Sequence, residues 1–134
     1  MPTFSSESLT QLQTCDERLQ DVLGLAIEMF DFKVLEGHRG QFAQDRAYSR
    51  GFSQVRWPKG KHNALPSKAV DLAPYPVDWT NSEAARQRFC YLAGFVMASA
   101  KSLGVALRWG GDWDGDQDTR DERFRDLGHF ELID

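Results

Sequence analysis

A long amphipathic pattern runs from residue 80 to residue 104. Thr80-Asn81-Ser82-Glu83 has the capping-box form that starts a helix, and Gly104 is a typical helix end. Between them, apolar residues recur at three- and four-residue steps on one helical face: Phe89, Leu92, Ala93, Val96, Ala100 and Leu103. We predict that this segment is the central core helix, against which the rest of the chain must pack.

Chain length and charge limit the classes of protein that need to be considered. A chain of 134 residues fits one domain, so residues 1–134 are predicted to form a single unit, and we expect a monomer. The net charge of −4 argues against a nucleic-acid partner and against tight docking on anionic membranes. The longest largely apolar stretch, residues 91–100, is too short to span a bilayer. Residues 1–7 lack the pattern of a secretory signal, which predicts synthesis in the cytoplasm without cleavage.

Periodicity elsewhere predicts a mixed architecture. A helical pattern covers residues 6–30 and is expected to break at Thr14-Cys15-Asp16-Glu17, a second capping-box pattern. A further helix is predicted at residues 40–49, strands at 32–36, 68–72, 105–109 and 129–133, and a polar loop at 110–125. The helices precede and interrupt the strands without regular βαβ alternation. We therefore predict an α+β fold in which a small, mainly antiparallel sheet packs against helices.

The two cysteines, Cys15 and Cys90, stand far apart and have no CxxC or CxxH neighbour. Each falls among apolar helical positions, and free cysteine is one of the most buried residue types. We expect two buried thiols, with a disulfide or a nucleophile as the alternative.

Three residues of types that bind zinc well are His62, Asp71 and His129, and the acid Asp126 lies three positions before the last of them. Two imidazoles and one carboxylate leave a tetrahedral zinc ion with one open position, which is typical of hydrolytic sites. The set therefore predicts an enzyme. A turn-capping role for Asp71 and ordinary structural roles for the histidines are the alternatives.

The sequences around these residues resemble one zinc peptidase family. The motifs are Gly37-His38-Arg39 followed by Gln44, Tyr48-Ser49-Arg50-Gly51, Lys61-His62-Asn63, Ser67-Lys68-Ala69-Val70-Asp71-Leu72, Trp109-Gly110-Gly111-Asp112-Trp113 and Asp126-Leu127-Gly128-His129-Phe130-Glu131-Leu132. In this order they resemble the family of D-alanyl-D-alanine carboxypeptidases and L-alanyl-D-glutamate endopeptidases, in particular its bacteriophage endolysin branch. The resemblance implies a hedgehog/DD-peptidase-like fold with zinc as cofactor.

The resemblance also implies roles for individual residues. His62, Asp71 and His129 would be the zinc ligands, although the spacing between His62 and Asp71 is longer than the family's usual one, so a longer loop is expected there. Asp126 would be the general acid–base group, with a solvated loop acid as the alternative and Glu131 as its rival. We assign Glu131 to orienting a ligand or an arginine.

Three further residues are expected around the substrate. Arg39 would face it, binding a carboxylate or stabilising the oxyanion, with a surface salt bridge as the alternative. Gln44 is a weaker candidate for substrate binding and could equally lie on a helix surface. Trp113 is expected to form a wall of the cleft, whereas Trp109 is expected in the core. His38 is expected to be a neighbour of the site and not a ligand.

An acidic run follows the motif at Trp109. Asp112, Asp114, Asp116 and Asp118 alternate along the chain and resemble the start of a calcium loop, D-x-D-x-D. The run departs from an EF-hand at Gln117 and Arg123, where glycine and glutamate are expected. Calcium is therefore a second candidate metal, and a solvated loop is the alternative.

Together these patterns predict a zinc metallopeptidase that cleaves the peptidoglycan stem peptide, at the L-alanyl-D-glutamate bond, as a phage or prophage endolysin in host cell lysis. It would be made in the host cytoplasm and act at the cell wall after release. A D,D-carboxypeptidase of the same family is one alternative. A zinc-stabilised peptidoglycan-binding module without turnover is the other, and it would lack the general base or have a fourth protein ligand.

Overall fold

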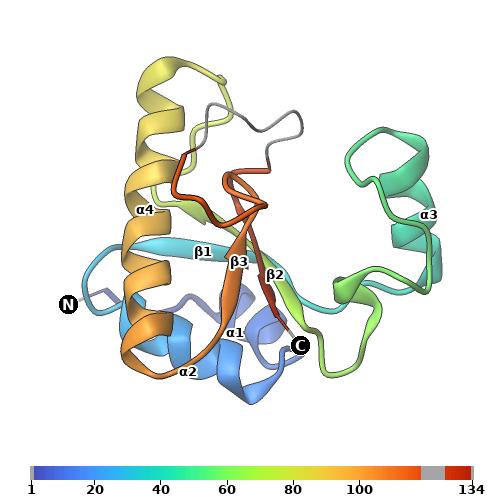
Figure 1. Cartoon of the computed structure of the whole chain (residues 1–134), viewed down its shortest axis with the longest axis horizontal. Coiled ribbons are helices and arrows are strands. Elements are labelled where there is room, and N and C mark those ends of the chain that lie inside the picture. The colour runs from blue at the N-terminus through green and yellow to red at the C-terminus, as the bar shows by residue number, and fades with distance from the viewer. Residues whose placement is uncertain (1, 119–125, 134) are drawn as a thin grey trace.

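The computed structural model describes residues 2–118 and 126–133, so the end of the predicted loop 110–125 lies outside the described residues. The elements are α1 (Ser6–Leu12), α2 (Glu17–Ala26), β1 (Phe32–Glu36), α3 (Gln41–Ser49), the 3-10 turn η1 (Lys61–Asn63), β2 (Ala69–Pro74), α4 (Glu83–Ser102), β3 (Leu107–Trp109) and β4 (His129–Leu132). The four strands form one antiparallel sheet in the order β1-β2-β4-β3 (Figure 1). The predicted α+β class is confirmed.

The two faces of the sheet have opposite chemistry because successive strand residues point to opposite sides. Val70 and Leu72 on β2, with Phe130 and Leu132 on β4, belong to the core cluster together with residues of α2 and α4. The alternate positions place polar side chains on the other face: Asp71, His129 and Glu131, with Arg108 of β3 paired to Glu131. Helices α2 and α4 therefore cover one face, and the polar face is left for a site.

Helix α4 runs along the sheet and buries Leu92, Ala93, Val96 and Ala100, as the apolar spacing predicts. Two details of that prediction are wrong. The helix is capped by Ser82, whose side chain accepts from the backbone N–H of Ala85, and not by Thr80. Leu103 follows the helix end at Ser102 as its C-cap and is 46% exposed, so it is not part of the core.

The break between the first two helices falls where the sequence predicts it, but the capping residue differs. Asp16 is the N-cap of α2 and accepts from the backbone N–H of Arg18. The Thr14 hydroxyl instead accepts a hydrogen bond from the backbone N–H of His38, at 2.8 Å. This contact ties the α1–α2 corner to the residues that follow β1.

The expectation of two buried thiols is half right. Cys15 is 2% exposed, and burial raises its pKa to about 11. Cys90 is exposed, because it lies on the outer side of α4. The two cysteines are not joined in a disulfide, so the disulfide alternative is wrong.

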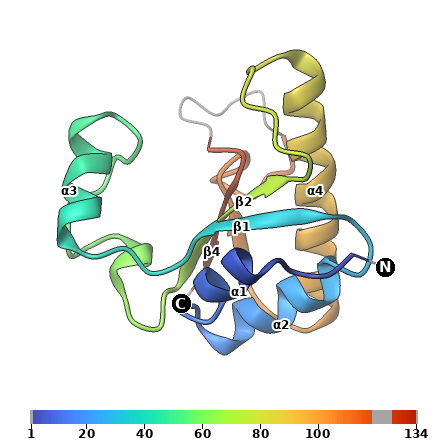
Figure 2. The same ribbon diagram turned by 180° about the vertical axis from the view of Figure 1, so that it is seen from behind.

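Helix α3 and the loop after it stand apart from the sheet and the other helices (Figures 1 and 2). We call residues 40–61 the α3 lobe. Its one buried residue in α3 is Gln44. None of the described helices combines the length and apolarity that a membrane crossing requires.

Candidate metal centre and its cleft

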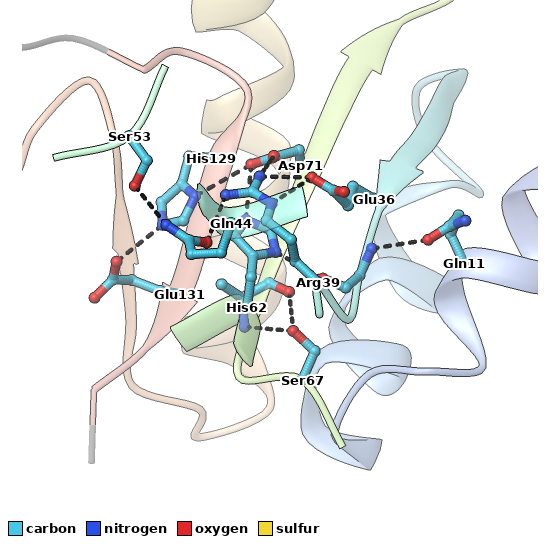
Figure 3. Close-up of polar contacts among 12 residues, drawn as sticks. Gln11, Glu36, Arg39, Gln44, Ser53, His62, Ser67, Asp71, His129 and Glu131 are labelled. Carbon is cyan, nitrogen blue, oxygen red and sulfur yellow. Dashed lines mark hydrogen bonds and ion pairs between the residues drawn. The ribbon is translucent and has the colours of Figure 1, made fainter. Parts of the chain in front are cut away.

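Three side chains from separate parts of the chain meet on the polar face of the sheet. Asp71, in strand β2, lies directly opposite His129 of β4. Oδ1 of Asp71 lies 3.1 Å from Nδ1 of His129 and 3.2 Å from Nε2 of His62 (Figure 3). Within residues 2–118 and 126–133, no fourth His, Cys, Asp or Glu joins this group. The predicted ligand set therefore converges at one point.

The longer spacing between His62 and Asp71 is taken up by a closed loop. The backbone N–H of Lys68 donates to the carbonyl of Lys61 at 3.0 Å, so the chain returns beside η1 before β2 begins. Asp71 then lies within a strand and contacts both histidines, so the turn-capping alternative is wrong.

The donor atoms fit a zinc ion in type, spacing and orientation. Tetrahedral zinc with bonds of about 2.1 Å separates its ligand atoms by about 3.4 Å, close to the two distances above. The imidazole nitrogens that face away from the centre are also held. Nδ1 of His62 lies 2.7 Å from the Gly37 carbonyl, and Nε2 of His129 lies 2.9 Å from Oε1 of Glu131. Such contacts orient histidine ligands, and the contact of Glu131 is the one expected for it.

The charges of the centre are strongly coupled. Burial alone raises the pKa of Asp71, but the two imidazoles outweigh burial and hold that pKa well below its ordinary value. Burial lowers the pKa of His129, but its hydrogen bonds to Asp71 and Glu131 raise it to about 9. Because a protonated imidazole cannot bind a metal, metal binding must release a proton from His129.

Asp126 lies in the same cleft as the three converging side chains. Its backbone N–H donates to the Gly110 carbonyl at 2.8 Å, and a Cβ at position 110 would lie 2.1 Å from the Asp126 carbonyl oxygen. Only glycine at 110 therefore allows this close approach. Burial, and next the carboxylate of Asp71, raise the pKa of Asp126. A raised pKa moves the group toward the range in which it can accept and return a proton.

Arg39 lies beside the centre and is engaged by protein groups on three sides. Nε lies 2.8 Å from Oε1 of Glu36, Nη1 lies 3.0 Å from Oε1 of Gln44, and Nη2 lies 3.3 Å from Oδ2 of Asp71 (Figure 3). Nη2 also donates to Glu36. The side chain is only 12% exposed, so the surface salt-bridge alternative is wrong. These contacts use four of the five guanidinium N–H groups, so one N–H is left to bind a substrate. A bidentate grip on a substrate carboxylate, which the resemblance implies, needs two.

Glu36 is a site residue that the sequence patterns do not predict. It precedes Arg39 by three positions at the end of β1, and an acid so close to an arginine was the available signal.

Gln44 is buried, and both ends of its amide are satisfied, so the helix-surface alternative is wrong. Oε1 accepts from Arg39 and from Asn63, and Nε2 donates to the Ser53 hydroxyl and the Val55 carbonyl. The side chain therefore joins the α3 lobe to Arg39, and it has no amide group left for a substrate.

The cleft has a volume of about 650 Å³, and its wall includes all of the predicted site residues outside the acidic loop. Trp113 lines it, with its ring centroid 5.4 Å from that of His129, as expected for a cleft wall. Trp109 instead packs against the core and donates to the Leu127 carbonyl, in agreement with its predicted place. His38 contacts the Ala64 carbonyl and is not part of the converging group.

The acidic run forms a second cluster beside the cleft. Asp112, Asp114 and Asp116 offer carboxylate oxygens within 4.8 Å of one another, whereas Asp118 is outside this group. Burial raises the pKa of Asp112, and the carboxyl groups of Asp114 and Asp116 add to the rise. Asp121 and Glu122, which extend the run in the sequence, lie outside the described residues.

An open sheet face that gathers two imidazoles, a carboxylate and a further acid in one cleft has the arrangement of a metal-dependent hydrolase. The sequence pattern of the phage L-alanyl-D-glutamate peptidase family matches residues 2–133. The L-alanyl-D-glutamate peptidase of Escherichia phage T5 is 34% identical over 139 residues, 97% of each chain. The crystal structure of the Serratia marcescens L-Ala D-Glu endopeptidase ChiX aligns with a TM-score of 0.74 and 27% identity, over 97% of this chain and 89% of that one. The chain therefore belongs to the phage L-alanyl-D-glutamate peptidase family.

Proposed function

We propose that this protein is a zinc endopeptidase that hydrolyses the L-alanyl-D-glutamate bond of the peptidoglycan stem peptide, as an endolysin in host cell lysis. The observation that carries the zinc assignment is the convergence of His62 Nε2, His129 Nδ1 and Asp71 Oδ1, with Asp126 in the same cleft. The choice of bond is supported by the names of the family and of both relatives.

When bound, zinc supplies a Lewis acid that acidifies water and polarises the scissile carbonyl. Asp126 would accept the proton of the attacking water and pass it to the leaving amine of D-glutamate, for which its raised pKa is suited. Glu131 holds the ring of His129, and Arg39 holds the second oxygen of Asp71, so both would support the ligands. Trp113 would contact the peptide.

Digestion of purified peptidoglycan tests the choice of bond. New amino groups on D-glutamate, identified by mass spectrometry, are the expected result. Release of terminal D-alanine would instead identify a D,D-carboxypeptidase. Binding without any new terminus would identify the wall-binding module, which the presence of Asp126 and the three-residue ligand group disfavour.

Arg39→Lys tests the proposed positioning role of this arginine. Lysine keeps the charge but cannot reach Glu36, Gln44 and Asp71 together, so Asp71 should be held less firmly. We expect zinc affinity to fall by about 10–100-fold, the usual cost of losing such a contact. Competition with a chromogenic chelator measures it. Arg108→Lys is the matched control, because Arg108 contacts Glu131 at 3.5 Å and is more exposed. Equal affinities in wild type and Arg39→Lys would contradict the role.

We also propose that the cluster of Asp112, Asp114 and Asp116 binds calcium. Close carboxylates repel one another, and a hard cation with a preference for oxygen ligands would remove the repulsion. Calcium added to zinc-loaded enzyme should therefore raise activity and change the fluorescence of Trp113, with half-saturation at or below about 10⁻³ M. Asp114→Asn with Asp116→Asn should abolish both responses. If neither activity nor fluorescence changes in the wild type, the acidic cluster is a solvated connector without a calcium site.

A further inference from the structure

The α3 lobe, residues 40–61, has a charge opposite to that of the rest of the chain. It contains five basic residues, Arg46, Arg50, Arg56, Lys59 and Lys61, and one acid, Asp45, for a net charge of +4. The whole chain has a net charge of −4, so the remainder carries −8. A local field of this kind favours an anionic partner at the lobe and disfavours it elsewhere.

The arginines of the lobe are exposed, and in the described part of the chain none of them forms an ion pair with an acidic side chain. Two of them lie over aromatic rings of the lobe itself. The guanidinium of Arg56 is 4.7 Å from the ring centroid of Tyr48, and that of Arg46 is 5.6 Å from Phe42. These contacts restrain the side chains without neutralising their charge.

The lobe forms part of the cleft wall. Residues 51–55 line the cleft, and Arg50 and Arg56 bracket them directly. Through Ser53 and Val55, this segment is bonded to Gln44, which in turn bonds Arg39 beside the metal centre. The segment between Arg50 and Arg56 is therefore tied to the residues beside the converging histidines.

The substrate must present a carboxylate near the cleaved bond. Glutamate has two carboxyl groups, and only one of them can continue the peptide, so the other is free unless it is amidated. Arg39 cannot grip it bidentately, because Glu36, Gln44 and Asp71 occupy its donors. Lys61 also lines the cleft but donates to the Leu132 carbonyl. Arg50 and Arg56 directly flank the cleft-lining residues 51–55, and neither is paired with an acid in the described part of the chain; Arg56 is held by Tyr48, which leaves its charge in place.

We infer that Arg50 and Arg56 form the subsite for the free carboxylate of D-glutamate and so select acidic stem peptides over amidated ones. This inference rests on the proposed function. The two guanidinium groups would donate charge-assisted hydrogen bonds to the carboxylate as the peptide lies across residues 51–55.

The test pairs a charge change in the enzyme with one in the substrate. A soluble stem tripeptide containing the L-alanyl-D-glutamate bond is compared with the same peptide bearing a carboxamide in place of the free carboxylate. We expect the wild type to prefer the acid. Arg50→Gln with Arg56→Gln should lower kcat/KM for the acid by at least about tenfold, mainly through KM, because hydrogen bonds to charged groups are the strong ones. The amide peptide should be unaffected, and Arg50→Lys with Arg56→Lys should restore part of the preference.

Lys33→Gln with Lys101→Gln is the matched control, since it removes the same charge on β1 and α4, outside the cleft wall. Equal losses for both peptides, or no preference in the wild type, would overturn the inference. Binding of both peptides is also measured by calorimetry, so the preference for the acid can be measured even if neither peptide is cut. Binding with this preference but without cleavage would refute the proposed function and leave the inference standing. If the two arginines are needed for binding phosphatidylglycerol vesicles and not for binding either peptide, the lobe is a membrane surface and the inference fails.

Discussion

Removal of the bound metal is expected to abolish hydrolysis, and zinc is expected to restore it. Among the described residues that line the cleft, none is a second electrophile of comparable strength, since the guanidinium of Arg39 is engaged by Glu36, Gln44 and Asp71. A metal that lowers the pKa of water from 15.7 to about 7 supplies several kcal/mol of the rate enhancement, so the loss should exceed the detection range of a lysis assay. The measurement is turbidity loss of a wall suspension after chelation and dialysis, with metal content checked by mass spectrometry. Full activity of protein shown to be metal-free would refute the zinc assignment.

Two further measurements connect this result to the named ligands. Asp71→Ala should lower both zinc affinity and thermal stability, because metal binding is coupled to folding. Apparent zinc affinity should also decrease as the pH falls below about 9, because the proton held on His129 by Asp71 and Glu131 must leave before the metal binds. Zinc affinity that does not depend on pH between 6 and 8 would contradict the raised pKa of His129.

Asp126→Asn should retain zinc and lose turnover by about 10²–10⁴-fold, the usual contribution of a general acid–base group. The amide has almost the shape of the carboxylate, so the close packing of the Asp126 backbone at Gly110 is preserved while the proton acceptor is removed. The readouts are kcat on a soluble stem peptide and zinc stoichiometry. We expect the first to fall and the second to stay at the wild-type value.

Glu131→Gln is the comparison that separates the two candidate acids. Glu131 contacts the far nitrogen of His129, so the variant should weaken zinc binding, and added zinc should restore part of the activity. Asp126→Asn should not respond to added zinc. If Glu131→Gln lost more activity than Asp126→Asn at saturating zinc, the assignments of the two acids would have to be exchanged.

Local spacing is enough to predict much of this fold. Alternating and helical periodicities follow from backbone geometry, so strand β1 and the buried face of α4 could be derived from the order of apolar residues alone. The same is true of the break before α2. Cap residues were less predictable, because Thr80, Ser82 and Asp16 are all good caps and the surrounding chain decides among them. Cys90 shows the same limit, since a helical position reveals its burial only once the packed face is known.

The identities of the metal-binding candidates were also readable in the sequence, because few residue types bind zinc and these stand in a recognisable order. The groups that surround these candidates could not be read from the sequence. The register of β2 against β4 places Asp71 opposite His129, and the end of β1 brings Glu36 and Arg39 against Asp71. These are contacts between residues far apart in the chain, and local propensity contains no information about them. We therefore propose that Arg39 supports Asp71 and does not grip a substrate carboxylate bidentately, because a guanidinium has only five donors and the fold has already used four of them.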